Sequence, residues 1–259
     1  MIKRGGIIFN ERTKKFNVDW KETHSYIVAI LQLNSVLNAQ KYAKGLLLDV
    51  GCGEKPFLYV FKDKIKDYIG IDMPSTLHLN EDIDVFSSAD YIAFKDRSFD
   101  TILTTSVLEH VIEPQKMFNE MYRVLKKDSY LILTTPCYYG LHEQPNDYFR
   151  YTKYSLRRIA EKSGFKVIYI KPVGGMLTIV TQLIAKYLSI FLYVLLEKMK
   201  GHKIDSESGF KKIKKNTLIQ FISFVPQKLF LILYNLGLKK IDDLSAEVDP
   251  CIYIMVAKK

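Results

Sequence analysis

Short apolar runs alternate with helical stretches along much of this chain, and that alternation restricts the fold more than any other feature. Six runs have the length and composition of strands: 46–50, 68–72, 83–86, 99–105, 130–136 and 165–173. Between them, residues 116–127 carry apolar side chains at helical spacing. A further helix is expected to begin near Ser155, as its N-cap, and to end at Gly164. Alternation of this kind predicts a parallel sheet with helices on both faces.

The first apolar run ends in a turn with two glycines. In LLLDVGCGEKP (46–56), Asp49 precedes Gly51 and Gly53, where a bare backbone lets a ligand approach closely. Such a turn after the first strand of a doubly wound sheet is a usual nucleotide cradle. A dinucleotide fingerprint needs a third glycine, which is missing here, so a dehydrogenase is disfavoured.

A second acid strengthens the case for a nucleotide site. Asp72 ends the next run, YIGID, 19 residues after Gly53. A carboxylate at that place accepts hydrogen bonds from both ribose hydroxyls of a nucleotide. Capping of strand ends is the alternative role for Asp49 and Asp72. Because both acids accompany the glycine turn, we favour nucleotide binding.

Four segments closely resemble, in order and spacing, the motifs of class I S-adenosylmethionine-dependent methyltransferases: LLLDVGCGEKP, YIGIDM, IAFKDRSFDTILTTSVLEHV and EMYRVLKKDSYLILTTP. The resemblance covers roughly residues 44–175. It implies an α/β fold with a doubly wound seven-stranded sheet in the order 3-2-1-4-5-7-6, strand seven (IYIMVAK) being antiparallel. It also implies a helical insertion between strands six and seven. We therefore expect an N-terminal helical cap (1–45), a methyltransferase domain (46–175 and 249–259) and an apolar and basic helical insertion (176–248).

The resemblance implies S-adenosylmethionine as the cofactor. The matching cofactor-binding positions are Asp49, Gly51, Cys52, Gly53, Asp72, Met73, Ser88 and Ala89. The glycine turn would border the methionine portion, Asp72 would take the ribose hydroxyls, and Met73 would pack against adenine. Ser88 stands where the family commonly has an Asp that contacts the adenine amino group, and a hydroxyl accepts that bond less strongly. Ala89 would offer its backbone N–H.

Methyl transfer to a hydroxyl needs alignment of the two reactants, exclusion of water and help in removing a proton. Two segments have side chains for this work. The first is SVLEHV (106–111), in which His110 is a catalytic candidate beside Glu109. A structural role for His110, satisfied by backbone groups, is the alternative that we favour.

The second segment, CYYGLHEQPNDYFRYT (137–152), follows the fifth strand and resembles a pattern in methyltransferases encoded with cell-surface glycan assembly. His142 is the first candidate for a general base, because an unperturbed imidazole titrates near neutrality. Asp147 is a further catalytic candidate. The candidate substrate-binding residues are Tyr138, Tyr148, Arg150 and Tyr151. A structural lid is the alternative. No metal site is expected.

Two apolar helices are expected between residues 176 and about 240, the second bent or broken at Pro226. One narrow polar stripe on the first consists of Thr178, Gln182, Lys186, Ser189, Tyr193 and Glu197. These interruptions make both helices poor candidates for membrane spans. The chain carries a formal charge of +10, and residues 198–215 hold seven lysines and two acids. An interfacial helix pair on an anionic membrane fits this pattern, and packing on the domain or a homodimer contact is the alternative.

We expect an enzyme that O-methylates a small-molecule, glycan or lipid-linked acceptor in the cytoplasm, at the inner face of the membrane. A methyltransferase acting on a quinone-type lipid precursor and a non-catalytic cofactor-binding adaptor are the alternatives. Nucleic acid is disfavoured as a partner, since TTSVLEH stands where an Asn-Pro-Pro-Tyr-like motif would follow the fourth strand. The three cysteines are far apart and show no disulfide framework or zinc spacing, which favours a reducing compartment.

Overall fold

The computed structural model describes residues 1–20, 26–74, 80–201, 213 and 216–259. The chain divides into two compact units. One consists of residues 1–31 and 174–249, and the other of residues 32–173 and 250–259.

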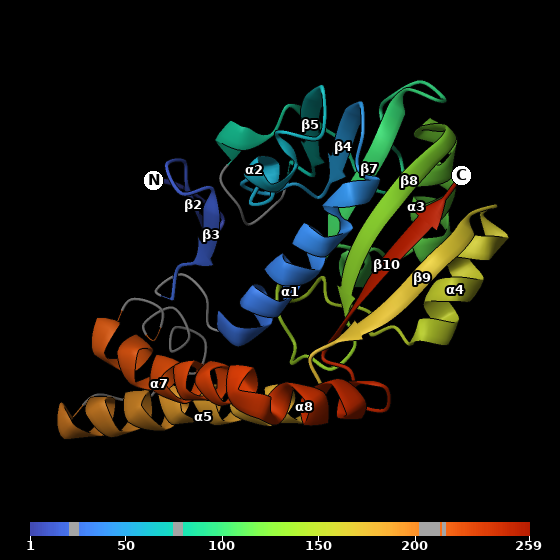
Figure 1. Ribbon diagram of the computed structural model, residues 1–259. Helices are drawn as coiled ribbons and strands as arrows, with labels where there is room; N and C mark the ends of the chain where they lie inside the picture. The colour runs from blue at the N-terminus through green and yellow to red at the C-terminus, as the bar shows by residue number, and fades with distance from the viewer. Residues whose placement is uncertain (21–25, 75–79, 202–212, 214–215) are drawn as a thin grey trace. The chain divides into compact units, whose positions relative to one another are not determined.

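The second unit is built on a seven-stranded sheet (Figure 1). Across the sheet, its strands are β6 (Val85–Phe86), β5 (Asp67–Asp72), β4 (Leu46–Val50), β7 (Phe99–Thr105), β8 (Leu125–Pro136), β10 (Ile252–Lys258) and β9 (Lys166–Val173). β10 runs antiparallel to both of its neighbours, and the other pairs are parallel. This order and these directions confirm the predicted fold class.

The central strands are buried on both faces. Leu47, Leu48 and Val50 of β4 are fully buried, as are Ile102 and Leu103 of β7. Strands buried on both faces read as continuous apolar runs, because neither face can be polar. The predicted runs therefore locate the strands well, although β6 is shorter and β8 longer than expected.

Helices complete this unit. They are η1 (Gln40–Tyr42), α2 (Leu58–Phe61), η2 (Asn80–Asp82), η3 (Leu108–His110), α3 (Pro114–Val124) and α4 (Lys153–Lys162), together with the end of α1 (Tyr26–Ala39). α3 begins at a proline, which suits a first helical position, and buries Met117, Phe118 and Met121.

The start of α4 corrects one prediction. The N-cap is Thr152, not Ser155: the Thr152 hydroxyl accepts from the Ser155 amide, and the Ser155 hydroxyl accepts from the Thr152 amide. Such a reciprocal pair satisfies two amides at once, so the helix begins earlier than a lone Ser cap would place it. Its end is as predicted, with Gly164 at a φ of 97°.

The first unit opens with strands where the sequence led us to expect a helical cap. β1 (Ile2–Arg4), β2 (Ile7–Asn10) and β3 (Lys15–Val18) form an antiparallel sheet, and among the described residues of 1–45 the one long helix is α1. Gly5 and Gly6 both have positive φ, as a two-residue hairpin turn requires. Phe9 stacks across the strands on Phe16, with ring centroids 4.8 Å apart.

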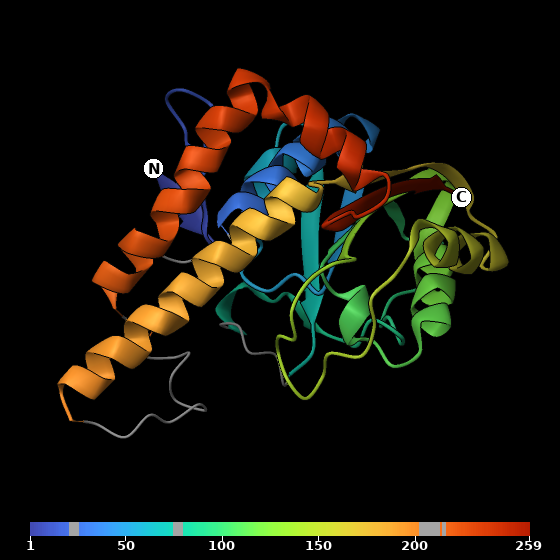
Figure 2. The same cartoon turned by 90° about the horizontal axis from the view of Figure 1, so that it is seen from below.

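The rest of the first unit is helical. Its elements are α5 (Met176–Met199), α7 (Thr217–Leu233), η4 (Tyr234–Leu238) and α8 (Lys239–Ala246). α5 and α7 lie side by side (Figure 2). α7 is not broken at Pro226, which lies inside the helix. The backbone becomes non-helical at Gly237 instead, whose φ of 148° disfavours a side chain. Most of the lysine-rich segment, at 202–212 and 214–215, lies outside the described residues.

Candidate active site

The glycine turn and Asp72 meet at the carboxyl ends of β4 and β5. These strands pair in parallel, with Val50 opposite Ile71, so both ends reach the same edge of the sheet. The Gly53 amide donates to Asp72 Oδ2 at 2.8 Å, and the Met73 amide donates to Asp72 Oδ1 at 2.7 Å. Each carboxylate oxygen keeps a further lone pair, so Asp72 is held in place and can still accept from a ligand.

The turn itself has no room for side chains at its bends. Gly51 has a φ of 72°, and a Cβ there would lie 2.3 Å from Val107 Cγ2. Gly53 also has a positive φ. Cys52 between them is buried, and its sulfur would meet a Cβ added at Gly70, so its side chain points away from the edge. Any part that Cys52 plays in the site is therefore a part of its backbone.

Asp49 lies beneath the turn as a buried acid. Its Oδ2 accepts from the Tyr68 hydroxyl, while its Oδ1 has no hydrogen-bond partner among the described residues. Burial raises the pKa of Asp49 to about 7, against the opposing effect of the Tyr68 hydrogen bond. A buried acceptor that lacks a partner is costly unless a ligand supplies one. The turn, Asp72 and Asp49 together therefore fit the S-adenosylmethionine that the resemblance implies.

The adenine end is less regular. Met73 is about half exposed after β5, as a residue that covers a base would be. The Ser88 hydroxyl donates to Asp90 Oδ1 at 2.6 Å, and Ala89 lies between them, partly buried. Asp90 was not identified from the sequence, although it places a carboxylate two residues after the position where the family commonly has one.

A lysine beside the turn was also not identified from the sequence. Lys55 Nζ pairs with Asp84 Oδ2 at 2.5 Å, and the same oxygen accepts from the Gly70 amide at 2.6 Å. Lys55 is buried at a positive φ, so its chain lies back against the turn. The basic residue directly after GCGE was the available signal, together with the acid before β6.

The loop 137–152 is tied to the turn after β7. The amides of Tyr148 and Phe149 donate to the Glu109 carbonyl at 2.9 and 3.2 Å. His110 Nδ1 lies 2.6 Å from the Asn146 carbonyl oxygen. The buried Tyr151 hydroxyl donates to the Leu108 carbonyl. These contacts bring His142 to His110, although 32 residues separate them.

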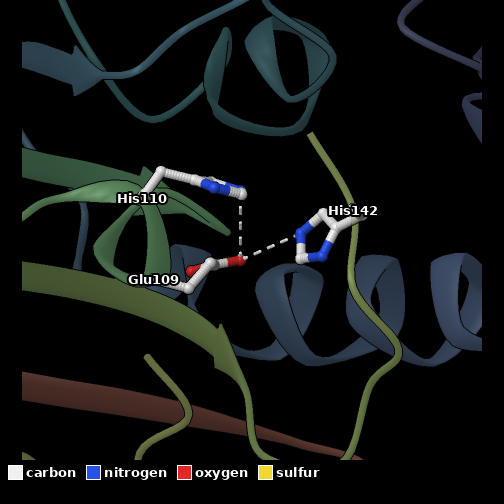
Figure 3. Close-up of side chains that lie close together, drawn as sticks. All are labelled: Glu109, His110 and His142. Carbon is white, nitrogen blue, oxygen red and sulfur yellow. Dashed lines mark ion pairs between the residues drawn. The ribbon is translucent and has the colours of Figure 1, made fainter. Parts of the chain in front are cut away.

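Glu109, His110 and His142 converge (Figure 3). Glu109 Oε1 lies 3.9 Å from His110 Nε2 and 3.8 Å from His142 Nε2. The other oxygen, Oε2, accepts from the Thr135 hydroxyl at 3.2 Å. Glu109 is fully buried, and the two imidazole rings meet edge to face. Within the described part of the chain, this is the group whose donor atoms lie close enough together to hold a metal ion.

Asp147 links Arg150 to the backbone of His142. Its two oxygens accept from Arg150 at 2.6 and 2.8 Å, and Oδ2 also accepts from the His142 amide. The Arg150 hydrogen bonds hold the pKa of Asp147 far below its ordinary value, so the carboxylate stays ionised. Burial lowers the pKa of His142, but Glu109 and Asp147 outweigh it, and the net shift is upward.

The four candidate substrate-binding residues divide into two pairs. Tyr138 and Tyr148 expose their rings, by 53% and 41%. Arg150 also donates to the carbonyls of Tyr139 and Gly140, and Tyr151 is part of the core. The first pair can meet a ligand, and the second pair holds the loop in shape.

A family model described as a methyltransferase domain matches residues 22–170. An uncharacterized protein of Methanocaldococcus jannaschii is 30% identical over 131 residues, which make up 49% of this chain and 58% of that protein. An uncharacterized methyltransferase of Mycobacterium leprae is 34% identical over 103 residues, or 37% of this chain and 38% of that protein. The chain thus spans about half the length of the curated relatives that it matches.

Solved structures share the fold. A crystal structure of an S-adenosylmethionine-dependent methyltransferase from Archaeoglobus fulgidus matches with a TM-score of 0.52 and 20% identity, over 90% of this chain and 94% of that one. The crystal structure of the [4+2]-cyclase SpnF matches with a TM-score of 0.56 and 18% identity, over 100% of this chain and 88% of that one. At such low identity, these likenesses show the fold alone.

Proposed function

Since the chain belongs to the methyltransferase-domain family and uses S-adenosylmethionine as its cofactor, we propose that it methylates an oxygen of a glycan or lipid-linked intermediate. The observation that carries this proposal is the joined edge of β4 and β5, where Gly53 and Asp72 bond beside the buried Asp49. The exposed rings of Tyr138 and Tyr148 support a sugar-containing acceptor, because they offer flat apolar faces with a polar tip.

The chain's own residues would hold the cofactor in a defined order along this edge. Asp72 would accept from the ribose hydroxyls, and Met73 would cover the adenine. Asp49 would face the positive charge of the methionine portion, which supplies the partner that its Oδ1 lacks among the described residues. When bound, the cofactor supplies a methyl group on a positively charged sulfur, which is already a good leaving group.

A hydroxyl acceptor must also lose its proton. The Glu109–His110–His142 cluster offers two imidazoles and a carboxylate for this, whereas both oxygens of Asp147 accept from Arg150. His142 keeps the base role that the sequence predicts. Its Nδ1 faces Asp147 and the Gly140 carbonyl, which leaves Nε2 directed into the cluster.

Replacement of this imidazole should separate chemistry from cofactor binding. We expect His142→Ala to lower turnover by about 10²–10⁴-fold, the usual contribution of a proton-transfer group, with cofactor affinity unchanged in calorimetry. His142 lies in the loop after β8, and Asp72 is the last residue of β5, so the two measurements report on different residues. Unchanged turnover would remove His142 from the reaction.

The activity itself is tested with methyl-labelled cofactor. The purified chain is incubated with extracts separated into soluble glycans, lipid-linked glycans and quinone-type lipids. Label in either glycan fraction supports the proposal, and label in the quinone fraction alone replaces it. Measurable cofactor binding without transfer to any fraction would favour a non-catalytic adaptor. The fold by itself does not require methyl transfer, since a [4+2]-cyclase shares it.

We also propose that the helices α5 and α7 bind a membrane, at its cytoplasmic face. The polar stripe of α5 is not its exposed face: Thr178, Gln182 and Ser189 are buried within the first unit. The exposed side chains of α5 before Lys198 are instead all apolar: Met176, Val180, Leu183, Ile184, Tyr187, Phe191 and Leu195. This arrangement is the reverse of a helix that packs its apolar side on a protein core.

The second helical segment shows the same reversal. Gln220 and Gln227 of α7 are buried, and Gln227 Oε1 accepts from the Ile27 amide. Its exposed apolar side chains are Leu218, Phe221, Val225, Leu229, Ile232 and Leu233. By length and composition, Met176–Met199 and Thr217–Ala246 could each cross a membrane, and only 28% and 22% of their most apolar windows are buried. A lipid phase that covers these faces suits a lipid-linked or quinone-type acceptor, and a second copy of the chain is the alternative cover.

A further inference from the structure

The Glu109–His110–His142 cluster brings a carboxylate oxygen and two imidazole nitrogens within 4.8 Å of one another. Glu109 Oε1 and His110 Nε2 are buried, and neither has a hydrogen-bond partner among the described residues. Glu109 is fully buried, and buried polar atoms ordinarily have a hydrogen-bond partner. Two orphaned atoms that face each other indicate that a further group belongs between them.

The hydrogen bonds of the two rings fix which nitrogen is the acceptor. His110 Nδ1 lies 2.6 Å from the Asn146 carbonyl oxygen, which can only accept, so Nδ1 carries the proton. His142 Nδ1 lies 3.3 Å from both the Gly140 carbonyl and Asp147 Oδ2, which are also acceptors. Arg150, 3.5 Å from the same nitrogen, already donates to both of these oxygens. In the neutral rings, Nε2 therefore presents a lone pair, and both lone pairs face Glu109 Oε1.

Acidic side chains lie around the two rings. Glu143 Oε2 lies 3.8 Å from His110 Nε2, and Asp147, which pairs with Arg150, lies beside His142. A dication would satisfy the converging lone pairs of Glu109 and the two imidazoles.

We propose that Glu109 Oε1, His110 Nε2 and His142 Nε2 bind a divalent transition-metal ion, with Zn²⁺ as the first candidate. Two imidazoles and one carboxylate with an open position are a usual ligand set for a catalytic zinc ion. The three ligand atoms lie within 4.8 Å of one another, and Glu109 Oε1 lies 3.9 and 3.8 Å from the two imidazole nitrogens, against the roughly 3.4 Å expected around tetrahedral zinc. Binding of the ion would draw the three side chains together.

Each proposed ligand also has a contact to a neighbouring residue through an atom other than its proposed metal-binding atom. Asn146 fixes His110, Asp147 and Gly140 fix His142, and Thr135 binds the second oxygen of Glu109. Such outer contacts orient metal ligands and set their tautomers. Their presence distinguishes this cluster from a chance meeting of polar side chains.

The role of the ion rests on the proposed function. A hydroxyl acceptor in the open position would have a lowered pKa and lose its proton to solvent water. Its oxygen would then form the bond to the methyl carbon as the carbon–sulfur bond breaks, with that electron pair left on sulfur. His142 would in this case act as a ligand, and the lowered pKa of the bound hydroxyl would replace the proton removal proposed for His142 above.

The test is metal binding by the full chain, made without a histidine tag and stripped by dialysis against a chelator. We expect calorimetry to give one Zn²⁺ per chain, and Co²⁺ to give the visible absorption of a site with nitrogen ligands. Glu109→Gln and His142→Ala should each weaken Zn²⁺ binding by at least about tenfold. The control variant, Glu113→Gln, changes an exposed acid four residues after Glu109 and should leave Zn²⁺ affinity unchanged. Cofactor affinity, measured on every variant, shows that each is folded.

Two results would overturn the site: no binding of Zn²⁺, Co²⁺ or Mn²⁺ by the stripped chain, or equal binding by the wild type and both ligand variants. If the metal-free protein transferred label at an undiminished rate, the methyltransferase activity would stand and the ion would have no role in the reaction. If the chain bound Zn²⁺ but transferred label to no fraction, the metal site would stand and the proposed acceptor would be wrong.

Discussion

Asp49 combines a structural cost with a binding role at a single residue. Its carboxyl group is buried, one oxygen is bonded to Tyr68, and burial raises its pKa to about 7. The folded chain without cofactor therefore holds the proton to a much higher pH than an ordinary Asp does. A cationic ligand next to the group would favour the ionised form and release that proton. Asp49 thus makes both cofactor affinity and stability depend on pH.

Cofactor affinity should fall as the pH falls through about 7. Below that value Asp49 is protonated before binding, so the affinity loses up to about tenfold per pH unit, and above it the dependence levels off. Calorimetry between pH 6 and 8.5 measures this. Asp49→Asn should bind the cofactor more weakly at pH 8, and its affinity should lack the pH dependence that Asp49 contributes. Any pH dependence that comes from titration of the cofactor itself is the same for both proteins. Parallel pH profiles for the two would contradict the role of Asp49.

The stability of the cofactor-free chain should fall as the pH rises, whereas its cofactor affinity should rise. The pKa is raised in the folded state, so its contribution is complete below the unfolded value near 4 and is lost as the pH rises toward 7. A difference of about three units corresponds to at most about 4 kcal/mol at pH 8. Asp49→Asn, which can still accept from Tyr68, should therefore unfold at a higher temperature than the wild type at pH 8 and lose that advantage near pH 4. A lower melting temperature at pH 8 would contradict this.

At the scale of elements, the periodicity of the sequence located the strands and helices, but it did not show which way each helix face points. The run 99–105 coincides with β7, because a strand buried on both faces needs an unbroken apolar sequence. The polar stripe of α5 was also visible as a period, but period alone does not say whether that stripe faces water or a neighbouring helix. Burial of Thr178 against Asp242 supplies that answer: the Thr178 amide and hydroxyl both donate to this carboxylate, which lies in α8.

The candidate site divides in the same way. Asp72 could be placed beside Gly53 from the sequence, since adjacent parallel strands end at one edge. The meeting of His142 with Glu109 could not, because it depends on the path of an irregular loop and on backbone bonds from Tyr148 and Phe149. No sequence pattern encodes such bonds, as any residue other than proline supplies the same amide.

The exposed apolar faces of α5 and α7 predict that the chain binds lipid vesicles. The fluorescence of Trp20, the single tryptophan, reports on α7, because its ring lies 6.0 and 5.4 Å from the rings of Phe221 and Phe224. With vesicles, its emission should shift to shorter wavelength and be quenched by brominated lipids. Phe191→Glu should weaken vesicle binding by at least about tenfold, because losing one buried aromatic side chain costs roughly 1.5–3 kcal/mol.

The matched control is Tyr154→Glu, which replaces an exposed aromatic residue of α4 in the other unit. It should bind vesicles as the wild type does. If Phe191→Glu bound equally well, or if it abolished a dimer that sedimentation detects without vesicles, the apolar face would be a contact between copies of the chain instead.

At the scale of the whole molecule, the charge of +10 and the apolar helices predict different responses to salt. Raising the ionic strength from about 0.1 M to about 1 M shortens the screening length from about 10 Å to about 3 Å, which removes attraction to anionic lipid but not burial in hydrocarbon. Flotation with anionic vesicles should therefore fall severalfold with salt and settle at the level that neutral vesicles show throughout. Complete release at high salt would mean that charge alone holds the chain to lipid, and the exposed faces of α5 and α7 would then need a protein partner. Binding that ignores both salt and lipid charge would instead assign all of the attraction to those faces, leaving the excess lysines without a part in it.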